Sequence, residues 1–281
     1  MIGNKRINIF LLLVPTLVIM VFFLLGILTI ARDSFNKFVS PGFMEPAYTL
    51  ENYLIFFTTP AYLNILYRTI RIAFVSTALS LMIGYPLAYY IVRGSPLIRR
   101  LCVSVTLFSF LTSILVRVFA WRIILGRTGL INRVLNAFGI PSSTSYLRTE
   151  SAVTIGLIYF LIPFVVFTLV GVIDKIPIEL EQAAKTLGAN EILTFLKVTL
   201  PLSIPGIISA SLISYCLGMS AFIIPLLLGG DQVKMLANII YDQSMFVVNY
   251  PFASATAIIL LVISLVIIVV YQEIVKRELK Y

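Results

Sequence analysis

Long apolar runs separated by polar stretches dominate the chain. Each run reaches the roughly 20 residues that an α-helix needs to cross about 30 Å of hydrocarbon. The runs lie at about residues 9–31, 69–92, 101–124, 152–173, 202–228 and 253–272. The sequence lacks the short segments of alternating polarity that are typical of an outer-membrane barrel. The pattern therefore predicts an all-α, polytopic membrane protein that crosses the bilayer about six times.

The composition agrees with this prediction. Hydrophobic residues make up 60% of the 281 positions and charged residues 12%, against about 45–50% and 25% in soluble domains. The net charge is +9, but the basic residues are scattered between apolar runs and form no continuous basic stripe. Such a distribution favours a role in membrane orientation over nucleic-acid binding.

The residue types also limit the chemistry. The chain has no histidine, which removes the commonest general base and the commonest metal ligand. Cys102 and Cys216 both lie in apolar runs, and we interpret them as small buried residues rather than as a disulfide or a metal site. The sequence predicts no catalytic residue, no metal site and no enzyme activity.

The basic residues at the ends of the runs predict the orientation. Lys5 and Arg6 precede an apolar run from Ile7 to Ala31, which is longer than the 7–15 residues of a signal peptide and is expected to remain as the first helix. The densest basic cluster, residues 93–100, lies in the shortest loop. The positive-inside rule then places both termini of the multi-pass chain in the cytoplasm. The predicted divisions are 1–64, a core domain 65–275 and a tail 276–281.

Several features inside the runs have two interpretations. Proline and glycine interruptions suit either ordinary packing kinks or the hinges of a transport path; they are Gly84, Pro86, Pro163, Pro205, Gly206 and Pro225. Arg117 and Arg122 lie deep in the third run, where a charge costs at least about 2.5–3.5 kcal/mol. This predicts that the third span ends near Arg117, with the arginines either at the outer interface or engaged in gating or docking.

The stretch from Asp174 to Pro201 is the long polar segment on the predicted cytoplasmic side. It reads DKIPIELEQAAKTLGANEILTFLKVTLP. Pro177 suits the start of a helix, the acids that follow suit its first turn, and Gly188 suits its end. A second helix is expected at about 190–200, with Pro201 opening the fifth span. The segment is therefore predicted to be a helix–turn–helix outside the membrane, which presents small residues to another protein.

This loop resembles the signature of permease subunits in binding-protein-dependent ATP-binding cassette importers. In that pattern Glu-Ala-Ala is followed by three residues, Gly, nine residues, a β-branched apolar residue, one residue and Leu-Pro. The matching positions are Ala183, Ala184, Gly188, Val198, Leu200 and Pro201. Gln182 stands where glutamate is usual, and Glu181 precedes it. It is open whether an ionic contact is lost at Gln182 or supplied by Glu181.

The resemblance implies a fold, a mechanism and partners. The implied fold is the type I importer transmembrane fold, in a multi-pass protein of the bacterial inner membrane. The implied partners are a cytoplasmic ATPase dimer that uses ATP and holds the loop, a second homologous permease subunit, an external solute-binding protein and membrane lipid. The chain has no Gly-x-x-x-x-Gly-Lys-Ser/Thr phosphate loop of its own and is expected to bind no cofactor. Residues 84–89, 113–117, 129–132 and 251–255 also resemble permeases for spermidine, putrescine and related solutes.

The solute and its path are less well defined by the sequence. A polyamine or a related amine or opine-like compound is favoured; another small solute in the same family is the alternative. Asp231, Asp242 and Glu150 could attract a cation or be solvated loop acids, and Tyr85 and Tyr89 could line a path or serve in packing. A secondary transporter is a weaker alternative, because none of the twelve acids lies near the centre of a predicted span.

Overall fold

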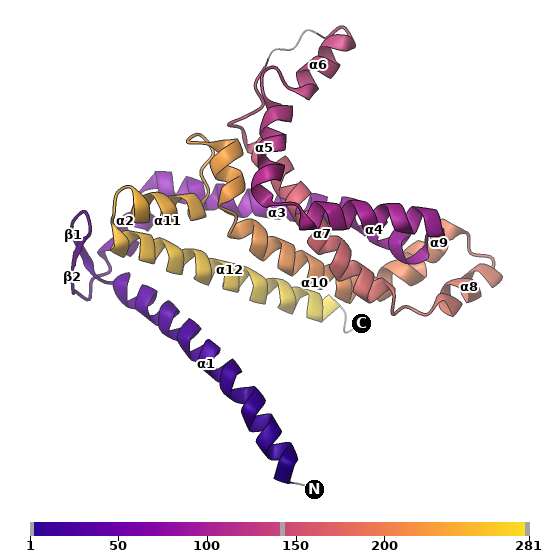
Figure 1. Ribbon diagram of the computed structural model, residues 1–281, viewed down its shortest axis with the longest axis horizontal. Coiled ribbons are helices and arrows are strands. Elements are labelled where there is room, and N and C mark those ends of the chain that lie inside the picture. Colours follow the sequence, from indigo (N-terminus) through magenta and orange to yellow (C-terminus); the bar gives the residue numbers. More distant parts are fainter. Residues whose placement is uncertain (1–2, 141–143, 279–281) are drawn as a thin grey trace. The chain divides into compact units, whose positions relative to one another are not determined.

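The protein is almost entirely helical in the computed structural model, which describes residues 3–140 and 144–278 (Figure 1). Contacts between Cα atoms divide the chain into two compact units, residues 1–63 with 239–263 and residues 64–238 with 264–281. Within the described ranges five helices are long and apolar enough to cross a membrane, or six when one bent pair is counted as a single span. The prediction of about six crossings is confirmed.

The first unit contains a feature that the hydrophobic pattern did not predict. After α1 (Gly3–Asp33), a short antiparallel hairpin forms from β1 (Lys37–Ser40) and β2 (Phe43–Glu45), and α2 (Glu51–Thr58) follows. The buried Asn52 side chain donates hydrogen bonds to the carbonyls of Ser34 and Asn36, each at 2.9 Å. One amide side chain therefore fixes the path of the chain where α1 leads into the hairpin.

The second unit holds the other helices and the helical core. Its elements are α3 (Pro60–Arg93), α4 (Pro96–Leu111), α5 (Ile114–Leu125), α6 (Leu130–Ala137), α7 (Glu150–Ile173), α8 (Ile178–Thr186), α9 (Glu191–Thr194), the π-helical turn η1 (Phe195–Thr199), α10 (Leu200–Met219) and the π-helical turn η2 (Pro225–Gly229). α3 begins four residues before this unit. Two further helices, α11 (Leu236–Met245) and α12 (Tyr250–Glu278), have residues in both units. The predicted tail 276–281 begins inside α12, and its last three residues lie outside the described ranges.

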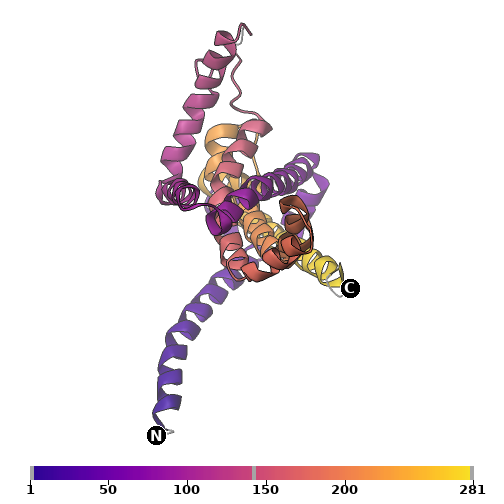
Figure 2. The same ribbon diagram turned by 90° about the vertical axis from the view of Figure 1, so that its right-hand side faces the viewer.

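α7 is the central helix of the second unit, and its buried residues repeat every four positions. Leu157, Leu161, Val165, Leu169 and Ile173 are fully buried. Figures 1 and 2 show α10 running beside α7. The two helices approach closely at Gly206, where an added Cβ atom would lie 2.8 Å from Cβ of Val172. A helix that is apolar on all sides is stable when other helices surround it, and this explains why the run 152–173 was predicted closely.

The third predicted span differs from the structure. Instead of one helix over 101–124, α4 ends at Leu111 and α5 begins at Ile114, and the chain bends by 102° at this break (Figure 2). At the break Thr112 has extended backbone, and Ser113 is also non-helical. Hydroxyl side chains favour helix ends because they compete for backbone hydrogen bonds, and the continuous apolar run conceals that local preference.

Arg117 follows this break and lies against α7. Its guanidinium carbon is 5.9 Å from the ring centroid of Tyr159 and 5.7 Å from that of Phe160. Aromatic faces attract a cation, by about 2 kcal/mol or more when the site is desolvated. This contact accommodates a charge within a largely apolar segment, and the prediction of an interfacial or gating role for Arg117 stays a prediction.

The fifth predicted span also has different limits. The helix is continuous from Glu191 to Met219 and does not begin at Pro201. It ends before the predicted limit at 228, and the chain is non-helical at Ala221 and Phe222. Pro225 has no N–H for a bond to the Ala221 carbonyl, which a straight helix would require. α10 therefore ends six residues before this proline, at Met219.

Candidate functional site

The loop between α7 and α10 forms the predicted helix–turn–helix. α8 begins at Ile178, directly after Pro177, and carries Glu179 and Glu181 in its first turn. Gly188 ends it with a φ of +89°. The Gly188 N–H donates to the Lys185 carbonyl and the Ala189 N–H donates to the Ala184 carbonyl, each at 3.0 Å. This is the Schellman arrangement, in which a left-handed residue satisfies the last carbonyls of a helix, so the predicted role of Gly188 as a helix terminator is confirmed.

The second half of the loop is joined to the membrane helix. Asn190 caps α9, because its side-chain oxygen accepts the Leu193 N–H at 2.8 Å. The chain then passes through the π-helical turn η1 into α10, where the Leu200 N–H donates to the Phe195 carbonyl. A π turn contains one extra residue, and it lies immediately before Pro201, whose ring would otherwise clash with a carbonyl one turn earlier. The second helix of the loop and α10 are therefore one continuous helical segment, Glu191–Met219.

The residues of the signature divide into an exposed and an inner set. Gln182, Ala183, Gly188 and Pro201 are exposed, Ala184, Val198 and Leu200 are half-buried, and Glu181 is buried. Several large apolar side chains of the loop are also exposed, among them Leu187 at 89%, Ile192 at 71% and Leu196 at 50%. Sequence analysis did not identify Ile192 and Leu196, although apolar residues in a polar loop are a signal for a protein contact.

Glu181 forms a buried ion pair with Arg93, the last residue of α3. Nε of Arg93 donates to Oε1 of Glu181 at 3.1 Å, and Nη2 donates to the Ile176 carbonyl at 2.6 Å. The Thr199 hydroxyl donates to the same Oε1 atom at 3.1 Å. The side chains of Arg93 and Glu181 are 12% and 8% exposed, and removing one partner of a buried pair typically costs about 3–5 kcal/mol.

This pair settles one of the alternatives left by the sequence. Glu181 contacts Arg93 and Thr199 inside the protein, so it does not supply an exposed ionic contact in place of the usual glutamate. Gln182 is the exposed residue at that position. Arg93 and Thr199 were missed by sequence analysis because they lie 88 and 18 residues from Glu181.

Tyr85 and Tyr89, predicted to line the solute path, lie near the loop. Both rings make edge contacts with Phe195, with centroids 5.5 and 5.7 Å apart. The Ser203 hydroxyl donates to the Leu200 carbonyl, so the Tyr85 hydroxyl, 2.7 Å from Ser203 Oγ, is the donor in their hydrogen bond. These contacts attach α3 to η1 and α10. They favour the packing interpretation, and a role in the path stays a prediction.

The acids predicted to attract a cation have basic neighbours or interactions of their own. Glu150, at the start of α7, forms ion pairs with Arg68 and Arg71 of α3. Asp231 is 97% exposed and pairs with Lys234 at 3.0 Å. Asp242 lies in α11 and is half-buried. The two arginines make Glu150 a poor site for a cation, whereas attraction of a solute by Asp231 or Asp242 stays a prediction.

Glu150 is expected to contribute to stability through these pairs. Glu150→Gln leaves two arginines without their counter-ion, and we expect a loss of about 1 kcal/mol, or an unfolding temperature lower by about 2–4 °C. The measurement is thermal unfolding of the purified protein in detergent. Asp231→Asn is the matched control, because its exposed pair should contribute nothing measurable. An equal shift in both variants would contradict this assignment.

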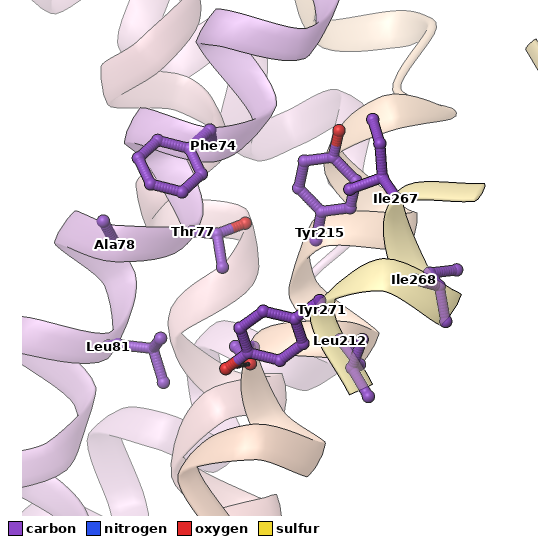
Figure 3. Close-up of a pocket in the computed structure, with 10 residues that line it drawn as sticks. Phe74, Thr77, Ala78, Leu81, Leu212, Tyr215, Ile267, Ile268 and Tyr271 are labelled. Atoms are coloured by element: carbon purple, nitrogen blue, oxygen red, sulfur yellow. Dashed lines mark hydrogen bonds between the residues drawn. The ribbon is translucent and has the colours of Figure 1, made fainter. Parts of the chain in front are cut away.

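A cavity of about 300 Å³ lies within the second unit, between α3, α10 and α12. Figure 3 shows Phe74 and Thr77 on one side and Tyr215 and Tyr271 on the other. Ser211 Oγ and the Tyr271 hydroxyl oxygen form a hydrogen bond at 2.9 Å. The ten lining residues include no charged side chain, so the cavity offers no counter-ion to a cationic solute. Among the described residues no group of three or more His, Cys, Asp or Glu could hold a metal ion.

Fold and loop together define a class: a polytopic helical membrane protein in which a helix–turn–helix between two long apolar helices exposes small and apolar side chains. The family model described as "Binding-protein-dependent transport system inner membrane component" matches residues 5–280, and the chain belongs to this family. It is therefore a permease subunit of an ATP-binding cassette importer and a multi-pass protein of the inner membrane.

Similar proteins narrow the comparison within the family. The chain is 34% identical over 266 residues to the spermidine/putrescine transport system permease protein PotB of Haemophilus influenzae, covering 94% of this chain and 89% of that protein. It is 32% identical over 254 residues to PotB of Escherichia coli K12, covering 90% and 92%.

Solved structures confirm the type I importer transmembrane fold. The membrane chain from a bacterial alginate transporter, in complex with an alginate-bound periplasmic protein, has a TM-score of 0.81 at 17% identity, and the match covers 98% of this chain and 96% of that one. A chain of the MetNI methionine transporter has a TM-score of 0.59 at 20% identity, covering 75% and 93%. At these identities the likeness concerns the fold alone.

Proposed function

We propose that this permease subunit forms half of the translocation path for a polyamine or a related small amine. The observation that carries the proposal is the identity of 34% and 32% to two spermidine/putrescine permeases over at least 90% of this chain. A second, homologous permease subunit would complete the path, and an external solute-binding protein would deliver the solute. ATP is bound and hydrolysed by a separate cytoplasmic ATPase dimer.

In this proposal the ATPase holds the surface around α8 and Gly188. The exposed signature residues Gln182, Ala183 and Gly188 contact the ATPase groove, with Leu187 and Ile192 adding apolar area. Small residues let the groove approach the backbone closely, and a fixed turn keeps the two helices of the loop in one orientation. Ala184, Val198, Leu200 and Pro201 hold that orientation from within the loop and from the start of α10. ATP-driven closure of the dimer then moves the loop, and the membrane helices follow.

The test is reconstitution of the whole transporter in proteoliposomes. The chain, its companion permease, the ATPase and the binding protein are incorporated, and uptake of labelled spermidine and putrescine is measured with and without ATP. We expect ATP-dependent uptake of at least one polyamine. Uptake of a different solute only would contradict the proposed substrate, and uptake driven by an ion gradient without ATP would favour a secondary transporter.

The proposed orientation places both termini and the loop in the cytoplasm. Cysteine is introduced at Lys185 or at Asp231 after Cys102 and Cys216 have been replaced by alanine, and intact cells are treated with a membrane-impermeant maleimide. We expect Asp231→Cys to react in intact cells, and Lys185→Cys only after the membrane is permeabilised. The reverse result would overturn the orientation.

A further inference from the structure

The buried ion pair between Arg93 and Glu181 connects the exposed loop to the membrane helices. We propose that Arg93 and Glu181 are positioning residues of the transport cycle: they form a rigid joint that makes the cytoplasmic end of α3 move together with α8. This inference rests on the proposed docking of the ATPase on α8. It assigns a role to residues on the buried, inner side of the loop.

The geometry makes this joint a single centre shared by three segments. Arg93 ends α3, Glu181 lies in the first turn of α8, and Thr199 ends the π turn that precedes α10. Oε1 of Glu181 accepts from Arg93 at 3.1 Å and from Thr199 at 3.1 Å. Arg93 also donates to the Ile176 carbonyl, in the connection between α7 and α8. A movement of α8 therefore acts on α3 and on η1 at one point.

The other contacts of α8 are weaker than the Arg93–Glu181 pair, so they are less able to transmit a movement of α8 to the membrane helices. Of its nine residues only Glu181 is buried, and Ala184 is half-buried. The second ion pair of the loop joins Lys185 to Glu191 at 3.4 Å, with side chains 50% and 89% exposed. Exposed pairs of long side chains are weak and change geometry readily. The Arg93–Glu181 pair is thus the strong polar connection of α8 to the bundle among the described residues.

The chemistry of the pair explains why it should be rigid. Apolar contacts are non-directional, so helices that share only such contacts can slide past one another. The planar guanidinium donates in two fixed directions, here to a carboxylate and to a backbone carbonyl, and any slide would leave a buried charge unpaired. α3 is therefore expected to follow α8 as α8 moves.

The experiment compares transport with ATP hydrolysis in the reconstituted complex. In Glu181→Gln the ionic contact is lost while the shape is kept. We expect the complex to assemble and to hydrolyse ATP at a rate close to wild type. The amount of solute taken up per ATP hydrolysed should fall by about tenfold or more, which corresponds to a loss of at least about 1.4 kcal/mol of coupling free energy. Arg93→Lys keeps the charge but loses the second donor direction, so we expect an intermediate ratio. Glu191→Gln, which breaks the exposed pair of the same loop, is the matched control and should behave as wild type.

A distance measurement separates a joint from a purely structural role. Spin labels are placed at Ser95, just after α3, and at Glu179 on α8, both exposed, in a chain without Cys102 and Cys216. In the wild-type chain the label distance should stay constant on ATP binding, whereas in Glu181→Gln it should change or broaden with ATP.

An unchanged distance together with an unchanged ratio of uptake to hydrolysis would overturn the proposal. So would loss of assembly in both Glu181→Gln and Arg93→Lys, because the pair would then serve folding alone. Failure of the proposed function itself would be seen separately, as absence of ATP-dependent uptake by the wild-type complex.

Discussion

Gly188→Val is expected to abolish most transport while the protein still inserts and folds. Gly188 has a φ of +89°, and a Cβ atom added there would meet nothing within 4 Å. The cost therefore comes from the backbone, because residues held in the left-handed region are strained by about 1–3 kcal/mol, and a β-branched side chain is among the least tolerant. Relief of this strain opens the turn and turns α8 away from α9. We expect ATP-dependent uptake to fall by about ten- to hundredfold, which corresponds to about 1.4–2.8 kcal/mol.

The chain supplies a matched control for this variant. Gly139 follows α6, has a φ of +77° and likewise has nothing within 4 Å of an added Cβ. Gly139→Val introduces the same kind of strain at a turn that has no part in the proposed coupling, so uptake should stay close to wild type. Equal losses in both variants would indicate a general folding defect, and normal uptake by Gly188→Val would contradict the role of the turn.

Gly206→Leu is expected to prevent correct folding of the second unit. A Cβ atom at Gly206 would lie 2.8 Å from Cβ and 3.0 Å from Cγ2 of Val172, and the branched valine has little rotamer freedom in a helix. α10 would have to move away from α7, which carries several fully buried core side chains of the unit. Overpacking costs about 1–3 kcal/mol and occasionally more, which is enough to reduce cellular abundance several-fold. The measurement is the amount of monodisperse protein recovered from membranes.

Gly171→Leu is the control for packing. Gly171 neighbours Val172 on α7, yet a Cβ atom there meets nothing within 4 Å, so recovery should be close to wild type. The paired change Gly206→Ala with Val172→Ala should recover part of what Gly206→Ala alone loses. If Gly206→Leu and Gly171→Leu gave the same yield, the close approach of α7 and α10 at Gly206 would be contradicted.

The most regular features could be predicted from the sequence because they depend on neighbouring residues. The length of an apolar run determines a span, which is why α7 was predicted closely. Pro177 and Gly188 mark the ends of α8 through their own backbone preferences. The spacing from Ala183 to Pro201 identified the family, because it reflects a local motif.

The remaining features depend on contacts between distant parts of the chain or on weak local signals. The bend at Thr112 is hidden inside an apolar run, and the hairpin 37–45 is stabilised by the side chain of Asn52. The burial of Glu181 depends on Arg93, 88 residues away. The spacing of apolar residues along the chain does not reveal a contact between such distant residues. For this reason Glu181 was predicted to belong with the exposed residues of the signature.

The central claim, that the loop around α8 is the surface held by the ATPase, can be tested by site-specific photo-crosslinking. A photoreactive amino acid is placed at the exposed Gln182, or at the exposed Gln232 outside the loop as a control, and the complete transporter is irradiated in native membranes. The account predicts a covalent product of this chain with the ATPase from position 182 and none from position 232. A product with the ATPase from position 232, or its absence from position 182 in an assembled and active transporter, would contradict it.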